Sequence, residues 1–290
     1  MENHALRVAL LVVATASFAP AAAAQYGHGP DHHRHDHHFP HDEELGHGGQ
    51  GPHAEHPHFT HPIVTESPLP EKQVRFNAVF AQEEGAEALE LEASVEFALT
   101  PNVGVEVAVP YTFVNPDEGG AEDGLDNMEV ALKFADYRFG QRGVVLGAGV
   151  ELGLPTGDAG RGIGDDRVIE VEPYAAVAFR RGDFEAVGVL RFGIPLNERS
   201  SEADDVDLEI AADGSVLYHL SPRFAVLLEL NGATVAAGDV NGESILMLSP
   251  GVNFAPLEET GLRIGIGVGV PLTEDEEVDW EGRLMAILHF

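Results

Sequence analysis

The chain has no cysteine, no long apolar run and few basic residues, and each absence excludes a class of structure. With 0 Cys among 290 residues, neither disulfides nor thiolate metal sites can stabilise the fold. No stretch reaches the roughly 18 uninterrupted apolar residues that a transmembrane helix needs. Only 16 Lys and Arg residues stand against 49 Asp and Glu, for a net charge of -33. This excess of negative charge argues against nucleic acid as a partner.

Residues 1–24 have the pattern of a cleaved export signal. Arg7 precedes an apolar run over residues 8–20, and Ala22, Ala23 and Ala24 stand directly before Gln25, as a signal peptidase requires. The apolar run is too short to cross a bilayer as a helix. We therefore expect an exported chain whose mature form begins at Gln25.

Residues 25–70 are a segment rich in His, Pro, Gly and acids. This composition cannot bury enough apolar surface to offset the entropy of ordering, so we interpret the segment as disordered without metal. It holds most of the 15 histidines of the chain. The candidate metal ligands are His28, His32, His33, His35, His37, His38, His41, His47, His53, His56, His58 and His61. Imidazole suits Zn, Cu and Ni, but the spacing selects no single tetrahedral set, and a solvated linker without a metal role is the alternative.

From Glu71 to the last residue, apolar side chains alternate with polar or small ones, which indicates one all-β domain over residues 71–290. Val103 and Val105 would share one face of a strand, while Gly104 and Glu106 share the other. Strands are expected near residues 72–82, 88–100, 103–114, 127–138, 143–154, 168–180, 184–195, 206–219, 223–233, 244–255, 261–272 and 279–290. Most have about the 9 to 11 residues with which a tilted strand crosses a membrane.

The links between these strands alternate in length. Short links are expected at residues 100–102, 139–142, 181–183, 220–222 and 256–260, and longer, mostly acidic loops at 115–126, 155–167, 196–205, 234–243 and 273–278. Outer-membrane barrels have this alternation of short periplasmic turns and longer external loops. A soluble β-sandwich is the alternative, but it would require neither uniform strand length nor alternating loops. We therefore predict a twelve-stranded antiparallel barrel in the outer membrane of a Gram-negative cell, with the histidine-rich segment in the periplasm.

The last strand places Leu284, Ala286, Leu288 and Phe290 at alternate positions and ends in an aromatic residue. This arrangement resembles the terminal assembly signal of bacterial outer-membrane proteins. The resemblance implies the barrel-assembly machinery and outer-membrane lipid as partners.

The alternation also predicts which charged side chains face the barrel lumen. The acidic ones are Glu90, Glu92, Glu96, Glu106, Glu129, Glu151, Glu170, Glu172, Glu185, Glu209 and Glu229, and the basic ones are Arg75, Lys133, Arg191, Arg263 and Arg283. An open lumen with this excess of acids would favour cations over anions. In the alternative reading the charges pair into a network that braces a closed barrel. The residues before Glu71 are candidates to enter a barrel of this intermediate size as a plug.

Enzymatic activity is not expected. His219 and His289 lie at strand ends with no serine in matching strands, so we expect an interfacial or lumenal structural role for both. The glycine-rich loop from Arg161 to Asp166 lacks the lysine and the helix that phosphate binding requires. No organic cofactor is predicted.

Residues 64–290 resemble the outer-membrane transporters of the phenol-degradation meta-pathway family. The likeness rests on three features of the sequence: Glu151 to Asp158, which reads ELGLPTGD before a glycine-rich loop, Glu172-Pro173-Tyr174 at a strand start, and Val109-Pro110-Tyr111 at a strand end. The resemblance implies a transporter barrel and transfers no binding residues. Together these observations predict a channel or transporter for a small solute or cation. The rivals are a metal-scavenging protein whose barrel is only an anchor, and a non-conducting structural barrel.

Overall fold

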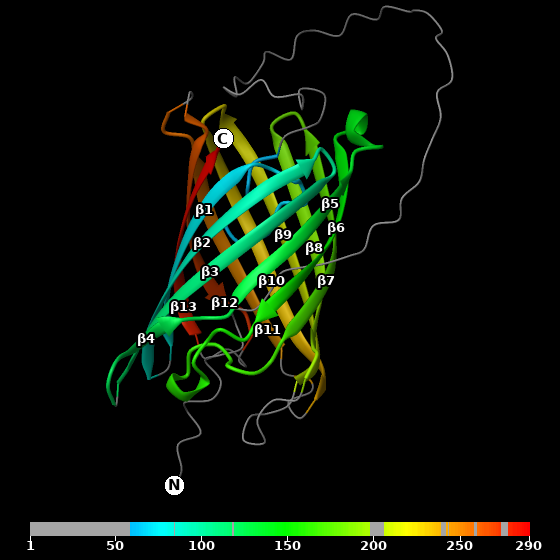
Figure 1. Cartoon of the computed structure of the whole chain (residues 1–290). Coiled ribbons are helices and arrows are strands. Elements are labelled where there is room, and N and C mark those ends of the chain that lie inside the picture. The colour runs from blue at the N-terminus through cyan, green and yellow to red at the C-terminus, as the bar shows by residue number, and fades with distance from the viewer. Residues whose placement is uncertain are drawn as a thin grey trace, which may run out of the picture.

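The chain closes into a barrel of antiparallel strands (Figure 1). The computed structural model describes residues 59–83, 85–117, 119–197, 206–238, 242, 244–257, 260–273 and 278–290, so the predicted export signal and residues 25–58 lie outside the described part. The strands are β1 (Gln73–Glu83), β2 (Ala86–Thr100), β3 (Val103–Pro116), β4 (Glu122–Leu125), β5 (Met128–Asp136), β6 (Val144–Leu154), β7 (Glu170–Arg181), β8 (Phe184–Pro195), β9 (Val206–Ser221), β10 (Phe224–Gly238), β11 (Ser244–Phe254), β12 (Leu262–Pro271) and β13 (Val278–His289).

Apart from β4 and β5, each strand pairs with its neighbours in the chain, and β1 pairs with β13 to close the barrel. The short β4 and the longer β5 pair with successive parts of β3, so these two strands together take the place of one. The predicted twelve-stranded antiparallel barrel is therefore confirmed. The two helices among the described residues are single 3-10 turns, and none there is long and apolar enough to span a membrane.

The break between β4 and β5 has a local cause in the side chains of Asp126 and Asn127. The Asp126 carboxylate accepts the backbone N–H of Asn127 at 2.7 Å, and the Asn127 amide oxygen accepts the N–H groups of Gly157 and Asp165 at 3.1 and 2.9 Å. Asn and Asp side chains commonly replace ladder hydrogen bonds in this way. The predicted strand over residues 127–138 therefore corresponds to β5, separate from β4. The hydrogen bonds of Gly157 and Asp165 attach the loop after β6 to Asn127.

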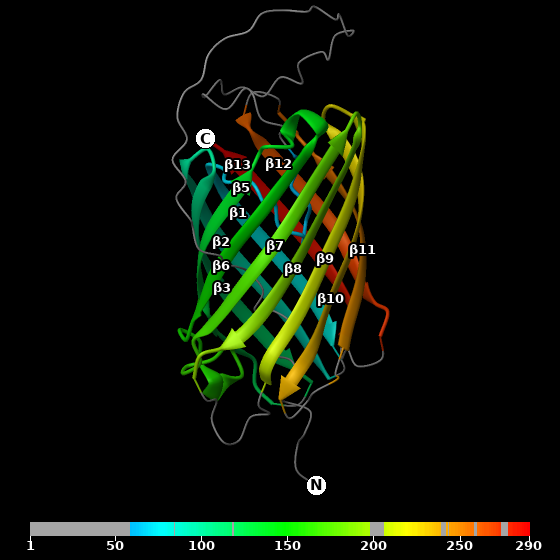
Figure 2. The same cartoon turned by 90° about the vertical axis from the view of Figure 1, so that its right-hand side faces the viewer.

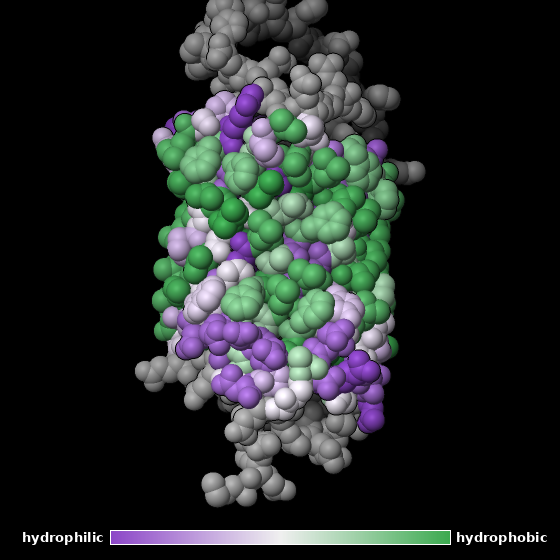
Figure 3. Space-filling model, turned by 90° about the vertical axis from the view of Figure 1, so that its left-hand side faces the viewer, coloured by the Kyte–Doolittle hydropathy of each residue, from purple (hydrophilic) through white to green (hydrophobic). Residues whose placement is uncertain are grey.

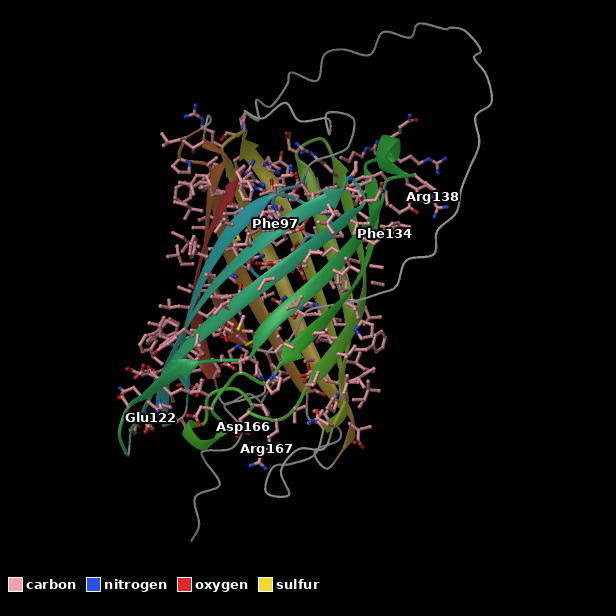
Figure 4. The ribbon with its side chains drawn as sticks, in the orientation of Figure 1. Phe97, Glu122, Phe134, Arg138, Asp166 and Arg167 are labelled. Atoms are coloured by element: carbon pink, nitrogen blue, oxygen red, sulfur yellow. The ribbon has the colours of Figure 1, made fainter. Side chains whose placement is uncertain are left out.

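The two ends of the barrel differ in their links. One end, here called the short-turn end, carries the turns after β2, β5, β7, β9 and β11 together with Phe290, and the other is called the long-loop end. In Figure 4, Phe97, Phe134 and Arg138 lie toward the short-turn end, and Glu122 and Asp166 lie at the long-loop end. The first link at the long-loop end, residues 84–85, is an exception because it is as tight as the turns opposite.

The outer face of the barrel is apolar. Side chains that point away from the lumen are largely exposed, among them Phe97 at 51%, Leu230 at 44% and Val216 at 43%. Figure 3 shows apolar residues covering the middle of this surface, with hydrophilic residues gathered toward the long-loop end. Soluble proteins rarely expose continuous apolar patches above a few hundred Å². A surface of this kind is suited to contact with lipid.

Residues 59–71, here called the lumen segment, run inside the barrel. Phe59, Ile63 and Leu69 are buried, and Figures 1 and 2 show this start of the described chain within the half of the barrel near the C-terminus. The sequence-based prediction that disorder extends to residue 70 is therefore wrong for residues 59–70. Its reason was the low aliphatic content, but the wall of the barrel provides the apolar and polar partners that the segment itself lacks.

Glycines of the wall make room for the lumen segment. A Cβ atom at Gly251 of β11 would lie 2.7 Å from Ile63 Cδ1, and one at Gly265 of β12 would lie 2.8 Å from Ile63 Cγ1. A Cβ at Gly147 of β6 would overlap the Pro68 ring. The polar or glycine positions that alternate with the apolar ones thus give this segment its space.

Candidate functional site

Carboxylates of the barrel wall hold the backbone of the lumen segment. Glu229 of β10 is fully buried and accepts the N–H groups of Ile63, Val64 and Thr65 at 3.1, 3.1 and 2.8 Å. Hydrogen bonds to an ionised acceptor are about twice as strong as neutral ones. Glu229 therefore fixes the segment at this point of the lumen.

The start of the lumen segment is held close to the short-turn end. The Thr60 N–H donates to Glu185 of β8 at 2.7 Å, and the His219 ring lies 3.0 Å from the same carboxylate. The Asn253 amide donates to the His61 carbonyl at 2.8 Å. His219 thus has the lumenal structural position that the sequence suggested.

Two basic side chains of the lumen, Lys133 and Arg191, are engaged by acids of the wall and of the segment. Lys133 of β5 forms ion pairs with Glu96 of β2 at 3.1 Å, with Glu106 of β3, and with Glu66 of the lumen segment. Arg191 of β8 lies 4.0 Å from the other oxygen of Glu66. One acid of the segment thus meets two bases that acids of the wall also pair, with Glu96 and Glu106 at Lys133 and Asp213 at Arg191.

Three further carboxylates form an acidic cluster, defined as Glu129, Glu151 and Glu172 on β5, β6 and β7. Glu151 stands directly opposite Glu172 in the ladder, and Glu129 is two residues before the residue opposite Glu151. Both Glu172 oxygens are buried and have no hydrogen-bond partner among the described residues. No ion pair of the cluster is found within the described part of the chain. The cluster lies in the half of the barrel toward the long-loop end.

The predicted lumen residues divide by burial and contact. Fully or nearly fully buried are Glu96, Glu151, Glu172, Glu209, Glu229 and Arg191, and half-buried are Glu90, Glu92, Glu106, Glu129, Glu170 and Arg263. Their ladder positions put them on one face of the strands. Glu92, for example, stands opposite Asn77 and accepts a hydrogen bond from its amide, so its side chain does not face the lipid. The structure brings Glu96 and Glu106 together at Lys133, and leaves Glu129, Glu151 and Glu172 beside one another.

His61 is the one predicted metal ligand that falls within the described residues. Its Nε2 lies 2.6 Å from Glu71 Oε2, and Nδ1 of His289 lies 3.3 Å from that same oxygen. The two imidazole centroids are 5.2 Å apart. Sequence spacing did not connect these residues, although the expected pairing of the first and last strands of a barrel brings the start of β1 to the end of β13. The predicted ligands His28 to His58 lie outside the described part.

The mouth at the short-turn end also carries a neutral phenol. Tyr137 follows β5 and packs against the buried cluster that includes Phe59 and Leu69. Burial, reinforced by the negative charges of Glu71 and Glu96, raises the pKa of Tyr137 to about 12. Tyr137 therefore adds no charge near neutral pH.

Comparison with solved structures shows that the fold is that of outer-membrane channels. An outer-membrane channel of Pseudomonas putida F1 matches with a TM-score of 0.61 at 15% identity, over 80% of this chain and 100% of that one. The NanC porin matches with a TM-score of 0.52 at 10% identity, over 74% and 98% of the two chains. The KdgM porin, in complex with disordered oligogalacturonate, matches at 0.50 and 10%, over 74% and 99%.

Comparison with models of known protein families gives no match, and neither does comparison with curated proteins. At these identities the similarity to the solved structures defines the fold alone.

Proposed function

We propose that this protein is an outer-membrane channel that passes a small cation or positively charged solute. The acidic cluster carries the proposal. Lys133 and Arg191 are engaged with other acids, whereas Glu129, Glu151 and Glu172 have no ion-pair partner among the described residues. Adjacent like charges are unfavourable unless a proton or a cation offsets them, and field focusing in a narrow lumen raises the local concentration of cations.

The difference between short turns at one end and longer loops at the other supports the proposed orientation. Short turns of outer-membrane barrels face the periplasm, so the acidic cluster would line the external half of the lumen and the lumen segment the periplasmic half. In this arrangement the cluster attracts the solute and the segment narrows its passage. The proposed location is the outer membrane of a Gram-negative cell.

Transition-metal binding by His28 to His61 is the second part of the proposal. Imidazoles at this density favour Zn, Cu or Ni, and a periplasmic segment would buffer these ions or deliver them to the lumen. A peptide of residues 25–65 is expected to bind Zn or Cu with micromolar or tighter affinity by calorimetry at neutral pH. Millimolar binding would leave a solvated linker.

The resemblance to the phenol-degradation transporters contributes only the transport role to this proposal. Its motifs lie at turns and strand ends, and the strand-end residue Glu151 belongs to the acidic cluster rather than to a site for an aromatic ring. Two rivals make different predictions. A structural barrel and a membrane anchor for metal scavenging would both be electrically silent.

Planar-bilayer recording of the refolded mature protein tests the channel proposal. Under a KCl gradient we expect a cation-selective reversal potential, and the double variant Glu151→Gln, Glu172→Gln should lower the cation-to-anion permeability ratio by roughly threefold or more. Glu87→Gln, an exposed position of β2, is the matched control. Current with no dependence on the cluster would refute the cation pathway, and silence in all variants would favour the rivals.

A further inference from the structure

Two histidines and a glutamate meet at the short-turn end of the lumen. His61 lies near the start of the lumen segment and Glu71 at its end, two residues before β1, whereas His289 is the last position of β13. The ligand atoms of all three side chains lie within 4.8 Å of one another. We propose that this triad binds one divalent transition-metal ion of the zinc class. The proposal does not depend on the chain conducting ions.

The donor set and spacing fit such an ion. Two imidazole nitrogens and a carboxylate oxygen are ligands that Zn²⁺ accepts, with a water in the fourth position. Ligand atoms bound at about 2.0 to 2.2 Å in a tetrahedral arrangement lie roughly 3.3 to 3.6 Å apart. The distance of 3.3 Å between His289 Nδ1 and Glu71 Oε2 already has this value. The distance of 2.6 Å between His61 Nε2 and Glu71 Oε2 is a hydrogen bond that would open by less than an ångström.

Neighbouring groups fix the backbone of the ligands. The His61 carbonyl accepts the Asn253 amide at 2.8 Å, and the Glu71 N–H donates to Glu96 at 2.9 Å. His289 is held in the ladder between β13 and β1. These hydrogen bonds hold the main chain from which the ligand side chains extend. The triad is thus ordered by the fold, unlike ligands on a flexible peptide.

Access to the triad is from one side. The His61 and Glu71 side chains are 2% and 11% exposed, whereas the His289 side chain is 33% exposed. An ion can therefore reach the three ligands past His289 and keep a water there. This site also differs from the histidine-rich segment, because two of its three ligands lie outside that segment and all three meet only in the folded barrel.

Metal binding at the triad would fasten the lumen segment to the strand that closes the barrel. An ion that binds only when His61 is near Glu71 and His289 stabilises that arrangement by mass action. Zn²⁺ is therefore expected to slow any departure of the lumen segment from the short-turn end.

The test uses the full mature chain in which every histidine of residues 28–58 is replaced by Gln. These positions lie outside the described residues, and the change removes competing ligands. Titration calorimetry with Zn²⁺ should show about one ion per chain. Co²⁺ should give visible absorption of a four- or five-coordinate nitrogen and oxygen site.

In that background, Glu71→Gln and His289→Gln should each weaken Zn²⁺ binding by roughly tenfold or more and abolish the Co²⁺ bands. Glu87→Gln is the matched control, because it removes an exposed carboxylate of β2 that is not in the triad. Circular dichroism shows whether each variant folds, and Glu71→Gln tests the site if His289→Gln impairs assembly. Absence of binding, or binding that neither variant weakens, would overturn the proposal whatever the conductance of the protein.

Discussion

Glu229 shows how a single side chain can order a segment that has no secondary structure. Its two oxygens take the N–H groups of three consecutive residues, Ile63 to Thr65. A hydrogen bond to a charged group contributes about 1.5 to 3 kcal/mol, and a buried N–H left without an acceptor costs a similar amount. Among the described wall residues, no other side chain accepts hydrogen bonds from three N–H groups of the lumen segment.

Glu229→Ala is therefore expected to loosen the lumen segment. The chain has 0 Cys, so Val64→Cys provides a single thiol whose rate of labelling reports exposure of the segment. We expect Glu229→Ala to speed this labelling roughly ten- to a hundredfold, the range that a loss of about 1.5 to 3 kcal/mol in local opening gives.

Glu92→Ala is the control for this experiment, because Glu92 hydrogen-bonds Asn77 of the wall rather than the segment. Equal labelling rates in both variants would show that Glu229 does not hold the segment in place.

At the scale of elements, the lumen segment behaves as part of the barrel although its composition is that of a linker. Its own residues offer few apolar side chains, but Ile63 packs against β11 and β12 and Pro68 against β6. The rule that such composition remains disordered assumes water on every side. Inside a barrel the wall replaces that water with hydrogen-bond acceptors and apolar contacts.

Replacing residues 62–70 by a Gly-Ser linker of the same length tests the role of this element. The strands pair with one another without the segment, so the barrel should still form. We expect the single-channel conductance to rise several-fold, because the linker cannot make the contacts that hold the native segment across the lumen.

The same replacement at residues 28–36, outside the described part, is the control and should leave the conductance unchanged. An unaltered conductance in the variant at residues 62–70 would mean that the segment does not narrow the passage.

At the scale of the whole molecule, the barrel must match the thickness of its membrane. Leu230 lies halfway along β10 and Leu99 lies next to the end of β2, and both are exposed on the outer face. Arg on a lipid-facing position costs about 2 to 4 kcal/mol at the bilayer midplane and about 0 to 1 kcal/mol near the interface. Leu230→Arg should therefore lower the free energy of unfolding in lipid vesicles well below that of Leu99→Arg. Equal losses of unfolding free energy would contradict the assignment of Leu230 to the middle of the lipid-facing surface and of Leu99 to its edge.

Much of the barrel could be predicted from the sequence, because strands and turns leave local signals. The alternation from Val103 onward placed β3, and Arg181-Gly182-Asp183 marked the turn to β8. The short strand β4 was missed because it lies within residues 115–126, which were expected to form a loop. Residues before Glu71 were anticipated as a plug that could enter the barrel, but the contacts of the lumen segment and the triad were missed. Both depend on contacts between residues far apart in the chain, which no local pattern records.

The course of the lumen segment has a consequence for assembly. Thr60 is held by Glu185 and Glu71 stands by His289, so both ends of the segment lie at the same mouth. The stretch between them enters the lumen and returns to the same mouth, so it forms a loop. A loop of this kind can enter or leave the lumen without a chain end being threaded through the barrel. The seam between the first and last strands can thus close before or after the segment is seated, and unseating it requires no opening of the seam.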